Sequence, residues 1–162
     1  MKKTLLTLFA AITVFAASAQ IEQGTIIING ASSFDFTSYN EDAGDFSEFN
    51  VGVKGGYFFA ENLAVGLNLS LYKFSEADDA WVGIGPFARY YFDGKIFAGA
   101  GFLFEKAGEA SASQIPLEVG YAIFLNDAVA IEPNLNYTLF GGDREGGAFG
   151  LNVGISVYLG RN

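Results

Sequence analysis

The chain has 162 residues and is acidic, with 18 Asp and Glu against 9 Lys and Arg, and 51% of its residues are hydrophobic. It contains no cysteine, so a disulfide framework and thiol chemistry are excluded, and no histidine, the commonest general base and metal ligand. Because the balance of charge is negative, we expect no nucleic-acid partner. We also expect no catalytic residue, no cofactor and no metal site.

Residues 1–19 predict a cleaved secretory signal peptide. Lys2 and Lys3 give a positive start, residues 5–16 form a mostly apolar run, and Ala17-Ser18-Ala19 has the small-x-small form of a cleavage site. The alternative is a transmembrane anchor, but the run is shorter than the roughly 20 apolar residues that a spanning helix needs. We therefore expect residues 20–162 to form one exported domain.

Eight β-strands are predicted along this domain, at about residues 24–37, 48–58, 62–74, 80–92, 95–105, 114–124, 128–139 and 148–159. Polar or small-residue loops are expected at 38–47, 75–79, 106–113 and 141–147. They alternate with short turns at 59–62, 93–94 and 126–127, of which Asp93-Gly94 is the strongest hairpin signal. Pro86, Pro116 and Pro133 fall inside strands, where we expect bulges or lost hydrogen bonds.

The strand at 62–74 shows how the two faces differ. Its large aliphatic residues recur at every second position, which is the period of a strand with one apolar face: Leu63, Val65, Leu67, Leu69 and Leu71. Glycine, alanine, asparagine and serine occupy the positions between them. Small polar residues suit a crowded, wet interior better than an open surface. We therefore predict an all-β fold, an eight-stranded antiparallel up-and-down transmembrane β-barrel whose apolar face meets lipid.

Aromatic residues on the apolar face sort to the two ends of the strands. They are expected to form girdles at the two membrane interfaces. One girdle near the short turns would contain Tyr57, Tyr90, Phe92 and Tyr121, and one near the loops Phe36, Phe49, Phe104, Tyr137 and Phe149.

Four charged residues fall on the polar face at similar depth: Lys54, Arg89, Glu118 and Glu132. Buried charges need partners, so we expect an interior ion cluster. It would either fill the barrel or line an ion path, and the first is favoured because eight strands enclose little more than their own side chains. Tyr72, Phe74 and Trp81 face inward near the loops. They either form an apolar pocket at the outer mouth or simply pack together.

Two stretches, residues 53–66 (VKGGYFFAENLAVG) and 85–92 (GPFARYYF), are similar to hairpin segments of small outer-membrane β-barrel proteins. The whole domain resembles that family, of the OmpX/OmpW and porin-family outer-membrane β-barrel type. The resemblance implies an outer-membrane location, insertion by the barrel-assembly machinery and no catalysis.

Several functions are compatible with the sequence. We expect a monomeric, non-enzymatic barrel in contact with outer-membrane lipid, with a structural or surface-interaction role. The alternative is a narrow porin-like channel or conduit for small molecules. A barrel enzyme is disfavoured because a serine nucleophile without a base is inert. A soluble, lipocalin-like barrel would need charged outer faces and an apolar interior, the reverse of the pattern here.

Overall fold

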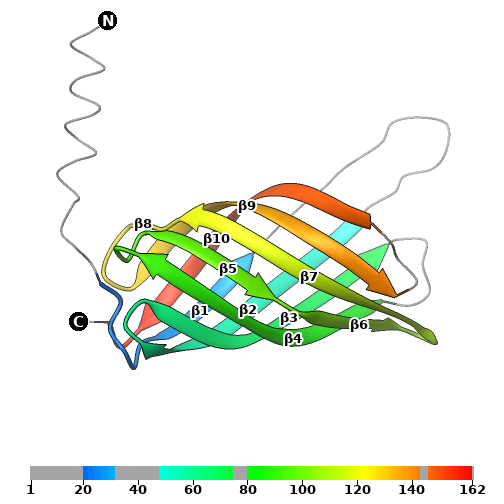
Figure 1. The fold of residues 1–162 in the computed structure, drawn as a ribbon, viewed down its shortest axis with the longest axis horizontal. Helices are drawn as coiled ribbons and strands as arrows, with labels where there is room; N and C mark the ends of the chain where they lie inside the picture. The colour runs from blue at the N-terminus through cyan, green and yellow to red at the C-terminus, as the bar shows by residue number, and fades with distance from the viewer. Residues whose placement is uncertain (1–19, 32–47, 75–79, 143–145, 162) are drawn as a thin grey trace, which may run out of the picture.

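The computed structural model describes residues 20–31, 48–74, 80–142 and 146–161, and these form a closed antiparallel barrel (Figure 1). Its strands are β1 (Ile26–Ala31), β2 (Glu48–Ala60), β3 (Leu63–Phe74), β4 (Trp81–Phe92), β5 (Ile96–Gly101), β6 (Leu103–Ala107), β7 (Ala110–Tyr121), β8 (Ile123–Phe124), β9 (Val129–Gly142) and β10 (Gly146–Leu159). β5 continues into β6 and β7 into β8, so the segments make eight barrel strands. Each pairs with the next along the chain, and β1 pairs with β10 to close the ring. The predicted all-β, eight-stranded antiparallel fold is confirmed. No helix among the described residues is long and apolar enough to cross a membrane.

Two barrel strands are interrupted beside prolines. The amide N of Phe102, between β5 and β6, donates to the carbonyl O of Pro86 at 2.9 Å, but Pro86 has no N–H with which to return the bond. The carbonyl of Phe102 instead lies over Gly85, where any Cβ would collide with it. The second interruption, at Ala122, lies between the pairs Gly120–Asn134 and Ile123–Ile131, which bracket Pro133 on β9. The expected irregularities thus occur at Pro86 and Pro133, whereas Pro116 stays in register with Thr138.

One end of the barrel, here called the turn end, carries the short connections. Asn62, Asp93 and Gly94 adopt positive φ there, at 60°, 49° and 67°, which suits these residue types. The N-terminal segment also folds under this end. The Ile21 N–H donates to Asn62 Oδ1 and the Asn62 N–H donates to the Ile21 carbonyl, both at 2.9 Å, and the Ile21 side chain is completely buried. The N-terminal segment therefore covers the turn end of the barrel.

The opposite end, here called the loop end, is built differently from the sequence prediction. The loop expected at 106–113 is a tight hairpin, in which Ala107 pairs with Ala110 and Lys106 with Ser111. Gly108, at φ 56°, makes the turn possible. The segment is rich in small residues with weak strand preference, so the sequence predicted a loop. The strand pairing is instead maintained by backbone hydrogen bonds. β9 and β10 also run further than predicted, to Gly142 and from Gly146.

Side chains alternate strictly between the interior and the outside. On β4, Val82 and Ile84 are 57% and 52% exposed, while Phe87 and Arg89 on the opposite face are 6% and 2% exposed. At the turn end the interior is apolar and is filled by a layer of buried rings, here called the aromatic layer: Phe58, Tyr91, Phe97 and Tyr158. The ring centroids of neighbouring members lie 5.4 to 6.3 Å apart. Together with Ile21, the aromatic layer closes the turn end.

Candidate functional site

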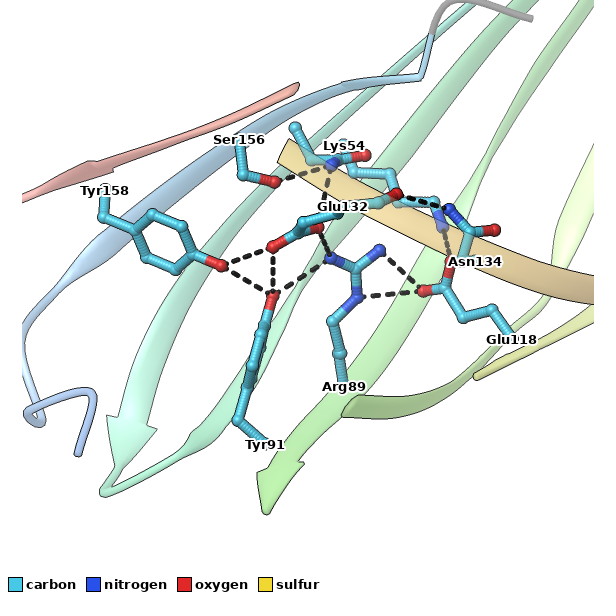
Figure 2. A network of polar contacts seen from close by, with 9 residues as sticks. Lys54, Arg89, Tyr91, Glu118, Glu132, Asn134, Ser156 and Tyr158 are labelled. Carbon is cyan, nitrogen blue, oxygen red and sulfur yellow. Dashed lines mark hydrogen bonds and ion pairs between the residues drawn. The ribbon is translucent and has the colours of Figure 1, made fainter. Parts of the chain in front are cut away.

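The four charged residues predicted to share the interior are brought together in one chain of ion pairs (Figure 2). Lys54 Nζ lies 2.7 Å from Glu118 Oε2, and Arg89 Nη2 lies 2.8 Å from Glu118 Oε1. Arg89 Nη1 reaches Glu132 Oε2 at 2.7 Å. Arg89 thus lies between the two carboxylates, and all four charges have a partner.

Strand register explains why Arg89 meets Glu118. The two residues flank Gly99 on neighbouring strands, Arg89 on β4 and Glu118 on β7. A Cβ at position 99 would lie 2.8 Å from Glu118 Oε1, so glycine leaves the space that the carboxylate occupies. Arg89 Nε and Nη2 then both donate to Glu118 Oε1, at 3.0 and 2.8 Å. Because Gly99 has no side chain, Arg89 and Glu118 can pair across β5.

Polar residues from other strands extend the cluster around Glu132. This carboxylate is completely buried and accepts hydrogen bonds from Arg89, from Asn29 Nδ2 at 3.1 Å, from Tyr91 OH at 3.2 Å and from Tyr158 OH. Asn29 also donates to Ser156 Oγ at 2.6 Å. We call the four charges with these four residues the ion network. Asn29, Tyr91, Ser156 and Tyr158 were not among the residues predicted for the cluster, although Tyr91 follows Arg89 by two positions and so shares its face.

The ion network rests on the aromatic layer. The Arg89 guanidinium carbon lies 4.3 Å from the centroid of the Phe97 ring, and Tyr91 and Tyr158 belong to both groups. A cation over an aromatic face is a favourable arrangement in a desolvated site. The interior therefore changes from apolar rings at the turn end to hydrogen-bonded charges toward the loop end, and the two groups are in direct contact.

Above the ion network, toward the loop end, lies a polar cavity of about 360 Å³. Its wall carries amide, hydroxyl and charged side chains with a few apolar ones: Asn29, Lys54, Asn68, Ser70, Trp81, Leu103, Glu105, Gln114, Pro116, Glu118, Asn134, Asn136, Thr138, Phe140 and Asn152, with the backbone of Gly52. Glu105 accepts hydrogen bonds from Ser70 Oγ at 3.3 Å and from Gln114 Nε2. Glu105 was predicted to end a strand and was not among the predicted site residues. Glu105 follows Gly101 and Leu103 at intervals of two residues, and this spacing places it on the same inward face.

The predicted mouth pocket is described only in part. Trp81 lines the polar cavity, and its backbone is paired with that of Tyr72. Phe74 is the last residue of β3 and pairs with Glu48. The side chains of Tyr72 and Phe74 lie outside the described part of the structure, so the pocket stays a prediction.

The predicted girdle residues that the structure describes all lie on the outside of the barrel. Near the turn end, Tyr57, Tyr90, Phe92 and Tyr121 are exposed, and Tyr90 and Phe92 pack edge to face with centroids 4.9 Å apart. Phe104, Tyr137 and Phe149 are exposed toward the loop end. Phe36 and the side chain of Phe49 lie outside the described residues, as does the predicted signal peptide at 1–19.

Comparison with protein-family models gives no match, and comparison with curated proteins gives none either. Within the described ranges, no three Asp or Glu side chains gather closely enough to hold a metal ion.

Proposed function

We propose that the protein is an integral outer-membrane β-barrel with a structural or surface-interaction role and no catalysis. The observation that carries this proposal is the apolar outer surface. All eight barrel strands expose large hydrophobic side chains, with exposed fractions of 41% to 73% for one representative each: Ile28, Val53, Leu67, Ile84, Ile96, Leu117, Leu135 and Leu151.

A continuous apolar surface of this kind is rare on monomeric soluble proteins, because water is a poor solvent for it. The interior of the same barrel holds the ion network and the polar cavity, so polarity is inverted relative to a soluble barrel. Aromatic side chains toward both ends of the apolar surface fit the headgroup regions of a bilayer. These features support contact with outer-membrane lipid.

The remaining parts of the proposal follow from the sequence. The signal peptide expected at 1–19 would export the chain, and the barrel-assembly machinery would insert it. The segments at 53–66 and 85–92 support kinship with OmpX/OmpW-like, porin-family barrels. We propose a monomer, because a closed ring leaves no strand edge through which a second copy could pair.

The test is to fractionate cells that express the full chain and to run the membrane fraction on a gel with and without boiling. We expect the protein in the outer-membrane fraction, with a folded band whose mobility changes on heating, because a closed ladder of hydrogen bonds resists detergent. A mature protein recovered from the soluble periplasmic fraction would overturn the proposal.

The alternative of a narrow channel requires a continuous path through the barrel. The aromatic layer and Ile21 fill the turn end with side chains of 0% to 1% exposure, which argues against such a path. We therefore expect the purified protein in planar bilayers to show no regular conductance steps. Reproducible single-channel steps that are absent from a mock-purified sample would favour the channel.

A further inference from the structure

Glu105 is a buried carboxylate with no cationic partner among the described residues. It is 6% exposed, and its two hydrogen-bond donors, Ser70 and Gln114, are neutral. The four charges of the ion network, on Lys54, Arg89, Glu118 and Glu132, balance two against two within their own ion pairs. Glu105 thus adds to the wall of the polar cavity a negative charge that no cation among the described residues pairs with.

Desolvating an unpaired charge is unfavourable, so such a group usually has a partner. Lys54 is not the ion-pair partner of Glu105, because its Nζ already pairs with Glu118 Oε2 at 2.7 Å. A carboxylate has about four acceptor positions, of which Ser70 and Gln114 use two, so Glu105 retains capacity for a further donor. Within the part of the chain that the structure describes, both donors to Glu105 are neutral, so its charge favours a cationic donor from a ligand.

The rest of the cavity wall favours a ligand with several hydrogen-bonding groups. Asn68, Asn136 and Asn152 line the cavity with Thr138, and amides both donate and accept. Asn136 Nδ2 is buried and has no hydrogen-bond partner. Trp81 adds an aromatic surface, and the volume of about 360 Å³ lies at the lower end of the range of about 300–1,000 Å³ typical of small-molecule pockets.

We propose that the polar cavity binds a small hydroxylated organic cation, whose ammonium group contacts Glu105 and whose hydroxyl groups contact the amides. A divalent metal is a poor candidate because calcium takes about six to eight oxygen ligands, and only one carboxylate here is free of ion pairs. The segments that connect strands at the loop end, 32–47, 75–79 and 143–145, carry nine Asp or Glu and one Arg in the sequence. Acidic segments of this kind attract cations at long range.

The experiment is calorimetric titration of the detergent-solubilised mature barrel with three sugars of equal ring size. Glucosamine at slightly acidic pH is a cation, glucose is neutral and glucuronate is an anion. We expect glucosamine to bind about tenfold or more tightly than glucose, since hydrogen bonds to charged groups are the stronger ones. Glucuronate should bind more weakly than glucose.

Two variants locate the effect. Glu105→Gln keeps the shape but removes the charge, and it should reduce the affinity for glucosamine to that for glucose. Glu109→Gln makes the same change in an exposed hairpin turn at the same end and should leave both affinities unchanged. If Glu105→Gln fails to fold, as loss of the heat-dependent gel shift would show, Gly83→Ala is tested in its place. A Cβ there would lie 2.2 Å from Ser70 Oγ and 2.9 Å from Glu105 Cγ, so it would displace the carboxylate and one of its donors without changing the charge.

Three outcomes would overturn the inference: no measurable binding of any sugar, equal binding of glucosamine and glucose, or an unchanged glucosamine affinity in Glu105→Gln. Displacement of glucosamine by K⁺ at equal concentration would also overturn it, in favour of a simple inorganic cation site. The inference depends on the closed barrel and not on the surrounding lipid. A soluble location would therefore contradict the proposed function and leave this test intact.

Discussion

Replacing Arg89 with leucine should lower the free energy of unfolding by about 3–5 kcal/mol, the usual cost of removing one partner from a buried ion pair. Arg89 is 2% exposed and touches both Glu118 and Glu132. Without it Glu118 keeps Lys54, but Glu132, which is completely buried, loses the only ion-pair partner that it has among the described residues. The measurement is equilibrium unfolding in urea of the barrel refolded into lipid vesicles.

Two further variants separate charge from packing. Lys106→Leu removes a positive charge from an exposed position at the loop end and should change the stability little. Glu132→Gln added to Arg89→Leu should restore part of the loss, because the amide oxygen still accepts from Tyr91 and Tyr158 while the uncompensated charge is gone. An unchanged midpoint in Arg89→Leu would mean that the ion network contributes little to folding.

Phe58→Ala should destabilise the barrel by about 3–5 kcal/mol, as truncation of a buried phenylalanine usually does. Its ring is completely buried in the aromatic layer, with centroids 5.6 Å from Tyr91 and 6.3 Å from Tyr158. The truncation leaves a cavity beneath the hydrogen bonds that these two tyrosines make to Glu132. Urea unfolding in vesicles again gives the free energy.

The neighbouring residue supplies a matched control. Phe59 has the same side chain but lies on the outside of the barrel and is 45% exposed. Phe59→Ala leaves no cavity, so it should cost clearly less than Phe58→Ala. Equal losses from the two variants would contradict the assignment of Phe58 to a packed interior layer.

The alternation of residue types predicted most of the architecture, because a period of two fixes which face each side chain joins. The alternation of side chains along each strand was enough to predict the inward positions of Lys54, Arg89, Glu118 and Glu132. Their partners could not be predicted in this way, since the strand stagger that brings Tyr158 of β10 to Glu132 of β9 is a property of the closed ring. Glu105 was missed for a related reason: its strand was expected to stop there, and the hairpin at Gly108 continues the ladder beyond it.

The glycines of the interior have a consequence for how such a sequence can change over generations. Gly83 leaves room for Glu105, Gly99 for Glu118, and Gly150 for Asn136, each across a strand boundary. A larger residue at one of these glycines is tolerated only if its neighbour becomes smaller. We therefore expect the two positions of each pair to co-vary among related proteins. Such co-variation between adjacent strands would show which interior side chains lie next to each glycine.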